Sequence, residues 1–321
     1  MKTFNTFTLL SSILLLTVLL LPLYTPEPVS AHGFAGDRFF PATISTDDPF
    51  AASELSLPTI SYNRQPGSPP TKTIDFSSDL SILVLPNVAV TLGDGYQWQK
   101  ADGQSAQTGF SNFTANILYE FFENDEHETI LSVGLTTEFG GTGSRSVGSS
   151  SFSTLTPIIY FGKGLGDLPT NFNLLRPLAV TGEFGLAMPT RSSDRSVTFN
   201  AANGQTQVTS TPNPDVFQWG FAVEYSLIYL QEHVKDIGLR APFDRLIPLV
   251  EFSMSTPVDR HGGTTTGTIN PGIIWSGKYC QVGIEAVLPV NEHTGFNPGI
   301  VGQLHFYLDD ILPKIFSKPL L

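Results

Sequence analysis

Charged residues are scarce in this sequence. Asp, Glu, Lys and Arg make up 14% of the 321 residues, whereas they account for about 25% of an ordinary soluble domain. The few charges are also unbalanced, with a formal net charge of −12 at pH 7. Nucleic acids are bound by basic surfaces, so this balance excludes them as partners. The shortage of charge suits a surface that faces lipid.

Long apolar stretches and cysteines are also missing from most of the chain. Beyond residue 31, no apolar run reaches the about 18 residues that a transmembrane helix requires. Cys280 is the only cysteine, which excludes an internal disulfide. The sequence has no phosphate-binding loop, dinucleotide fingerprint or Gly-x-Ser-x-Gly elbow. We therefore expect neither an enzyme nor a cofactor.

The first 31 residues have the features of a cleaved signal peptide. Lys2 precedes an apolar stretch over 7–23, and 29–31 is a small-residue end suited to signal peptidase. A retained membrane anchor is the alternative, because the stretch is nearly long enough to span a bilayer. Two prolines near its end favour removal, which would make His32 the first residue of a secreted chain.

What the chain does contain is a set of segments that alternate between apolar and polar residues, as strands with two different faces do. Such alternation extends over 112–122, 129–140, 217–230 and 280–288. In each of these segments, no acidic or basic residue occurs among the residues of the apolar face. A charged residue on a lipid face costs about 2–4 kcal/mol at the bilayer midplane, so its absence favours a transmembrane barrel. In 112–122, for example, Phe113, Ala115, Ile117, Tyr119 and Phe121 alternate with Asn112, Thr114, Asn116 and Glu120.

The pattern predicts about twelve antiparallel strands, most of them long enough to cross a bilayer when tilted, which takes about 9–11 residues. Longer Gly/Ser/Thr/Asn-rich loops alternate with tight turns, as in the outer membrane of Gram-negative bacteria. We therefore predict an all-β fold, a transmembrane antiparallel β-barrel in contact with outer-membrane lipid, with both chain ends in the periplasm. The segments are 55–64, 72–83, 87–98, 110–122, 128–140, 151–162, 172–188, 215–230, 244–256, 264–276, 279–290 and 298–308.

The chain then divides into a signal peptide (1–31), an N-terminal periplasmic or plug segment (32–54), the barrel (55–308) and a C-terminal periplasmic tail (309–321). The N-terminal segment contains Asp47-Asp48-Pro49, a predicted helix start. This segment is a periplasmic lid, a plug in the lumen or a disordered leader. Predicted aromatic belt residues, which would be core residues in a sandwich, are Trp98, Trp219, Tyr229 and Trp275.

Two stretches of the sequence carry a resemblance to a known family. The opening 32–41 (HGFAGDRFFP), followed by Thr46-Asp47-Asp48-Pro49-Phe50, and the closing 302–310 (GQLHFYLDD) resemble a subgroup of uncharacterised proteobacterial envelope proteins. That group is similar to the MetA-pathway of phenol degradation family of outer-membrane barrels. The resemblance implies a roughly twelve-stranded barrel that carries hydrophobic or aromatic compounds, with no catalytic residue.

A glutamate followed by an aromatic or small apolar residue lies within six of the predicted strands. On the wet face, these carboxylates would form an acidic lumen that favours cations or contacts a passing solute. Alternatively they are structural and bind inward Ser, Thr, Gln and Tyr, or Arg176 and Arg245. They lie on strands of both directions, so they need not form one ring. The six lumen-facing candidates are Glu120, Glu138, Glu183, Glu224, Glu251 and Glu285.

The sequence predicts a passive channel or transporter for small solutes, hydrophobic or aromatic ones included, through a narrow acidic lumen. One alternative is a soluble periplasmic β-sandwich that binds a ligand. Another is a copper protein in which the amine and imidazole of His32 hold Cu(II). The other histidines are scattered without ligand spacing, so no metal site is predicted. A serine hydrolase assembled across strands, with His305 facing inward, is a further alternative.

Overall fold

Twelve antiparallel strands close into a barrel. The computed structural model describes residues 33–67, 69–200, 205–260 and 263–321. Each strand pairs with its neighbours along the chain, β17 pairs with β3, and the pairing of β4 with β5 completes the ring. The barrel strands are β3 (Glu54–Gln65), β4 (Thr71–Leu85), β5 (Val88–Ala101), β7 (Thr114–Asn124), β8 (Thr129–Glu138), β9 (Thr154–Gly164), β10 (Leu178–Pro189), β13 (Val216–Tyr225), β14 (Leu246–Pro257), β15 (Thr266–Ser276), β16 (Cys280–Pro289) and β17 (Gly299–Tyr307).

The remaining elements are short. They are the strand pairs β1 (Phe34–Ala35) with β2 (Arg38–Phe39) and β11 (Ser193–Asn200) with β12 (Gln205–Pro212), the strand β6 (Gln107–Phe110), the turns η2 (Arg145–Val147), η3 (Thr170–Leu175), η4 (Leu230–Val234) and η5 (Phe243–Arg245), and the helices α2 (Leu227–Tyr229), α3 (Leu308–Ile311) and α4 (Pro313–Phe316). None of the helices in these described ranges is long and apolar enough to cross a membrane.

The predicted all-β barrel is confirmed, and the sandwich is not the fold, because one sheet closes on itself. Each of the twelve predicted segments overlaps one barrel strand. The segment 215–230 was wrong at its end, because the strand stops at Tyr225. There the Ser226 hydroxyl accepts the N–H of Tyr229 at 3.2 Å and starts α2. Between β10 and β13, where the strand pattern predicts one of the longer loops, the chain forms the β11–β12 hairpin.

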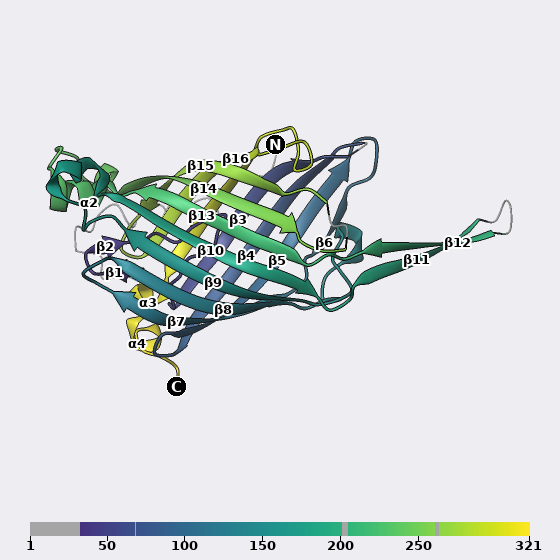
Figure 1. Cartoon of the computed structure of the whole chain (residues 1–321), viewed down its shortest axis with the longest axis horizontal. Helices are drawn as coiled ribbons and strands as arrows, with labels where there is room; N and C mark the ends of the chain where they lie inside the picture. Colours follow the sequence, from purple (N-terminus) through teal and green to yellow (C-terminus); the bar gives the residue numbers. More distant parts are fainter. Residues whose placement is uncertain (1–32, 68, 201–204, 261–262) are drawn as a thin grey trace, which may run out of the picture.

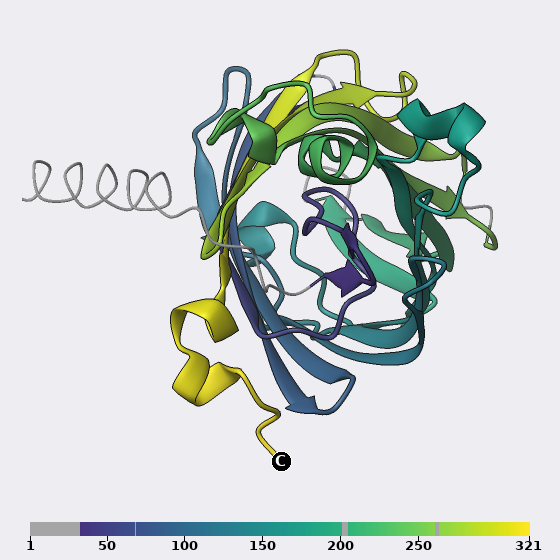
Figure 2. The ribbon, with the colours of Figure 1, turned by 90° about the vertical axis from the view of Figure 1, so that its left-hand side faces the viewer.

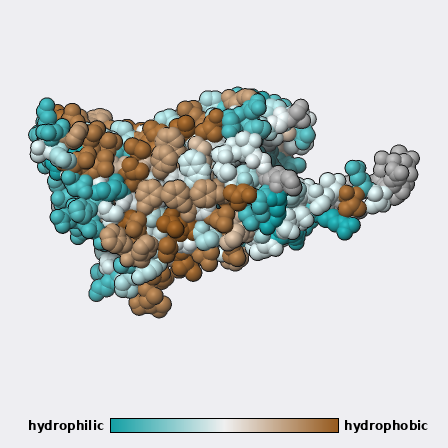
Figure 3. Space-filling model, viewed as in Figure 1, coloured by the Kyte–Doolittle hydropathy of each residue, from teal (hydrophilic) through white to brown (hydrophobic). Residues whose placement is uncertain are grey.

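The outer wall of the barrel is apolar. Ile117, Ile284 and Phe184 are 54%, 50% and 47% exposed, as large apolar side chains rarely are on a soluble monomer. Apolar atoms cover the middle of the wall in Figure 3, between more polar ends. The same strands turn polar residues inward, among them Gln281 and Glu285, both 1% exposed. This distribution is that of a membrane barrel.

The two ends of the barrel differ. Tight turns, the helix α2, the C-terminal helices α3 and α4 and the start of β3 lie at one end, and the β11–β12 hairpin projects beyond the other (Figure 1). We call these the inner and outer ends. The described N-terminal segment, residues 33–53, starts at the inner end with β1 and β2, which lie within the ring of strands in Figure 2.

Candidate functional site: the N-terminal segment inside the barrel

The carboxyl group of Glu251, on β14, holds the N-terminal segment. Its two oxygens accept the backbone N–H groups of Ile44, Ser45 and Thr46 at 2.8, 2.9 and 2.7 Å, and the Thr46 hydroxyl at 2.9 Å. Glu251 is fully buried. Consecutive backbone N–H groups form a concave site for an anion, here filled by a side chain of the barrel wall. Four donors on one carboxyl make this the densest contact between segment and wall.

The segment spans the lumen from one wall to the other. Residues 42–46 contact β14 and β16, and residues 49–51 contact β7 and β8, which are nearly opposite in the ring. Besides Glu251, the contacts are Gln281 Nε2 to Ala42 O at 2.6 Å, Ser45 Oγ to Glu285 at 2.7 Å, Ala51 N to Glu120 at 3.3 Å, and Ser132 Oγ to Pro49 O.

The structure gives the six predicted glutamates different surroundings. Glu120, Glu251 and Glu285 bind the N-terminal segment as described above, and Glu183 accepts the backbone N–H of Asp47. Near the outer end, Glu138 binds Asn112 Nδ2 at 2.7 Å and Ser150 Oγ at 3.2 Å. The remaining one, Glu224, is 2% exposed, and its Oε1 has no hydrogen-bond partner. Sequence reasoning missed the backbone amides of 44–51 as the main donors.

A second contact fixes the segment at the inner end. Arg38 on β2 is fully buried, and its Nε lies 3.1 Å from Oε2 of Glu128, which is in the β7–β8 turn. Its other nitrogens donate to the carbonyls of Pro177 and Arg176 at 3.0 and 2.5 Å. The guanidinium also stacks 3.7 Å from the ring centroid of Tyr229. Every polar nitrogen of this buried cation therefore has a partner.

Glu128 is satisfied from three sides. Besides Arg38, it accepts the backbone N–H of Gly166 and the hydroxyl of Tyr229, each at 3.0 Å. Tyr229 was predicted in an aromatic belt, but this was wrong, because α2 carries it into the barrel mouth, where it is 5% exposed. Arg38 and Glu128 are separated by 90 residues, and no local sequence pattern links them.

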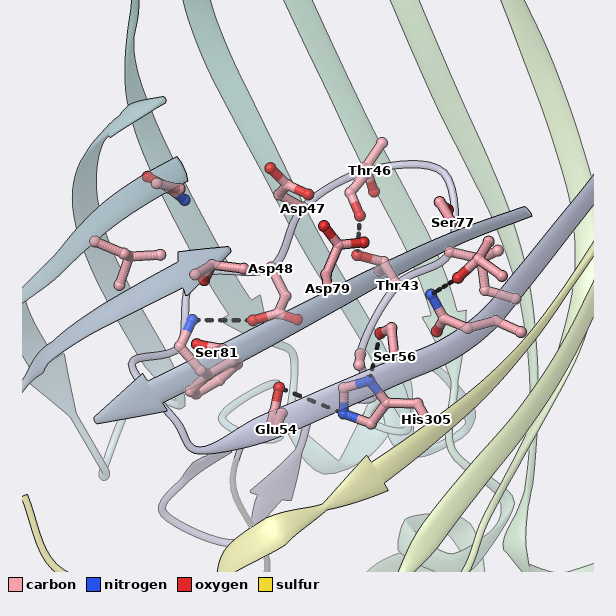
Figure 4. Close-up of a pocket in the computed structure, with 18 of the residues that line it drawn as sticks. Thr43, Thr46, Asp47, Asp48, Glu54, Ser56, Ser77, Asp79, Ser81 and His305 are labelled. Atoms are coloured by element: carbon pink, nitrogen blue, oxygen red, sulfur yellow. Dashed lines mark hydrogen bonds and ion pairs between the residues drawn. The ribbon is translucent and has the colours of Figure 1, made fainter. Parts of the chain in front are cut away.

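A cavity of about 300 Å³ lies between the segment and the wall formed by β3, β4, β5, β7 and β17. Figure 4 shows Asp47, Asp48 and Asp79 facing one another across it. Next to them, His305 Nδ1 lies 2.9 Å from Ser56 Oγ, and its Nε2 lies 3.4 Å from Glu54. A bulge after Ser56 shifts the β3–β4 register at this point. Four carboxyl groups line the cavity, so it is acidic.

Burial raises the pKa of Asp48 well above its ordinary value, and the neighbouring Glu54, Asp47 and Glu251 raise it further. Burial and Glu251 likewise raise the pKa of Asp47. Both shifts mean that the segment binds protons more tightly inside the barrel than when released. Binding of the segment inside the barrel, which we call docking, is therefore most stable at low pH. It weakens as the pH rises from the ordinary pKa of an aspartate through the raised pKa values of the docked segment.

This linkage predicts a pH-dependent opening. Current through the protein in a planar bilayer should be larger at pH 8 than at pH 5, because ionised Asp47 and Asp48 disfavour the docked segment. Asp48→Asn should reduce the difference and keep the protein closed at pH 8. Larger currents at pH 5 than at pH 8 would contradict the prediction.

The copper hypothesis cannot be placed on the structure, because His32 and the predicted signal peptide lie outside the described residues. Within the ranges that are described, no group of three His, Cys, Asp or Glu side chains has the arrangement of a metal site. Arg176, one of the alternative partners predicted for the glutamates, donates from Nε to the Gly166 carbonyl at 2.7 Å.

Comparison with known proteins finds similar barrels and no family. No family model and no curated protein matches the sequence, so the resemblance to the MetA-pathway family stays a prediction. Among solved structures, the KdgM porin is 10% identical (77% of this chain, 98% of that one; TM-score 0.41). The NanC porin is 8% identical (78% and 98%; TM-score 0.43). The β domain of the Bordetella autotransporter BrkA is 12% identical (80% and 99%; TM-score 0.47).

Proposed function

We propose that the protein is an outer-membrane channel for small polar solutes, and that residues 33–53 act as a plug that closes its lumen. The observation that carries the proposal is the plug's passage across the lumen, held by four hydrogen bonds to Glu251 on one side and by Glu120 and Ser132 on the other. The apolar outer wall supports placement in a membrane. The predicted cleaved signal supports export to the outer one.

The polar lumen supports polar rather than hydrophobic solutes. The 300 Å³ cavity is lined mainly by hydroxyl, amide and carboxyl side chains, with few apolar ones such as Ile44 and Leu118. A hydrophobic or aromatic compound would bury these polar groups without giving them hydrogen bonds, which is costly. The carboxyl groups Asp47, Asp48, Glu54 and Asp79 favour cations over anions along the path.

Planar-bilayer recording of the full chain tests this proposal. We expect brief openings, and in a potassium chloride gradient we expect a reversal potential that shows preference for potassium. Asp79→Asn should lower that preference, because it removes a carboxyl group from the wall that lines the path. Folded protein, verified by heat-modifiable mobility on a gel, that never conducts would overturn the proposal.

The Ser56–His305–Glu54 arrangement resembles the nucleophile, base and orienting acid of a hydrolase. We propose that it is structural, because Asp48 and Asp79 line the same cavity and would repel the oxyanion that hydrolysis creates. A fluorophosphonate probe should therefore label the folded protein no more than it labels Ser56→Ala. Labelling that is lost in both Ser56→Ala and His305→Gln would instead identify a serine hydrolase.

A further inference from the structure

A second cavity lies on the outer side of the plug. It has a volume of about 380 Å³ and is formed by β3, β14, β15, β16, β17 and the loop that follows β16. Among the residues that the structure describes, Ser45 alone borders both this outer cavity and the acidic inner one. The hydroxyl and amide of Ser45 bind Glu285 and Glu251. A solute arriving from the outer end therefore meets this cavity before it meets the plug.

The outer cavity differs from the inner one in charge. Nine of its thirteen described lining residues carry a neutral hydroxyl or amide, and none of the thirteen carries a carboxyl group. Its one cation, Arg64, is paired with Asp102 at 3.0 Å. Val287, Pro289 and Val301 form the apolar part of the lining. Such a surface offers both donors and acceptors but little net charge.

A polar atom at this cavity is buried without a hydrogen-bond partner. It is Oδ1 of Asn270, an acceptor. Asn270 is 1% exposed and faces inward from β15, so bulk water does not satisfy its Oδ1. A buried polar group without a partner is costly, typically by about 1–3 kcal/mol. A ligand hydroxyl can donate a hydrogen bond to this oxygen.

We propose that the outer cavity is a binding site for an uncharged polyhydroxylated solute, of the size of a mono- or disaccharide or a polyol. The inference rests on the proposed channel function and names the class of solute that enters it. Ligand hydroxyls bind the amides and hydroxyls of the lining, Asn270 foremost. The C–H faces of the solute pack on Val287 and Val301. The neutral lining admits such a solute, and the plug below it retains it.

Calorimetric titration of the folded full chain in detergent tests this site. Sucrose and sorbitol serve as neutral probes, with spermidine and gluconate as charged ones. We expect saturable binding of at least one neutral probe. Asn270→Leu should weaken this binding about tenfold, because it removes the amide and keeps the branching and the number of side-chain heavy atoms. The matched control is Asn173→Leu, which removes another amide with an unpartnered Oδ1, in η3 at the inner end.

The outcomes separate the site from the channel. Neutral binding that Asn270→Leu weakens and Asn173→Leu preserves supports the site. Binding of only a charged probe, or equal binding by wild type and Asn270→Leu, overturns it even if bilayer currents are observed. Bilayers without current, together with Asn270-dependent sugar binding, would overturn the channel and leave a receptor for the same solute.

Discussion

Glu251→Gln is expected to raise the open probability of the channel about 100-fold. An amide has one acceptor oxygen where the carboxyl group has two, and each Glu251 oxygen accepts at least one backbone N–H of the plug. Whichever way the amide turns, its NH₂ group faces a donor. Hydrogen bonds to charged groups contribute about 1.5–3 kcal/mol, and a buried donor without a partner adds to the cost. A loss of about 3 kcal/mol corresponds to about 100-fold in the docking equilibrium.

Single-channel recording measures this change, and two variants serve as controls. Glu120→Gln weakens one hydrogen bond of 3.3 Å and should have a much smaller effect. Glu138→Gln changes a carboxyl group whose hydrogen bonds go to Asn112 and Ser150 near the outer end, away from the plug, and should leave the open probability unchanged. If folded Glu251→Gln opens no more often than Glu138→Gln, residues 33–53 do not gate the channel.

The sequence predicts the barrel well because each strand carries its own evidence. Alternation over Phe113 to Phe121 places apolar residues outside, and a slip of one residue would put Glu120 into lipid. The turn at Ser226 was harder, because a strand and a short helix of apolar residues look alike until the capping hydroxyl is placed. Twelve local patterns are enough to specify twelve strands.

The candidate site depends on contacts that no local pattern encodes. Glu251 binds backbone amides more than 200 residues away, and amide N–H groups are present in nearly every residue. The sequence predicts the glutamates, but it does not predict that the backbone N–H groups of the N-terminal segment are their partners. Arg38 was missed for the same reason, since its carboxyl partner Glu128 lies in a turn whose sequence predicts exposure.

Arg38→Met is expected to lower the free energy of unfolding by about 3–5 kcal/mol, because it leaves the Glu128 carboxyl group buried without its cation. The remaining donors, Gly166 N–H and the Tyr229 hydroxyl, carry no full charge. Urea unfolding of the protein in lipid vesicles, followed by tryptophan fluorescence, measures the loss. Faster proteolysis within 33–53 should accompany it, since Arg38 fixes that segment to the barrel.

The double variant Arg38→Met/Glu128→Met tests whether the loss of unfolding free energy comes from the unpaired, buried carboxyl group of Glu128. Removing both charges eliminates the unpaired carboxyl group, so the double variant should be more stable than Arg38→Met alone. Arg38→Lys keeps the charge but loses the planar fork that reaches the carbonyls of Pro177 and Arg176, so it should fall between wild type and Arg38→Met. A double variant as unstable as the sum of the two single ones would mean that the ion pair contributes nothing. In that case packing on Tyr229 holds the inner end of the plug.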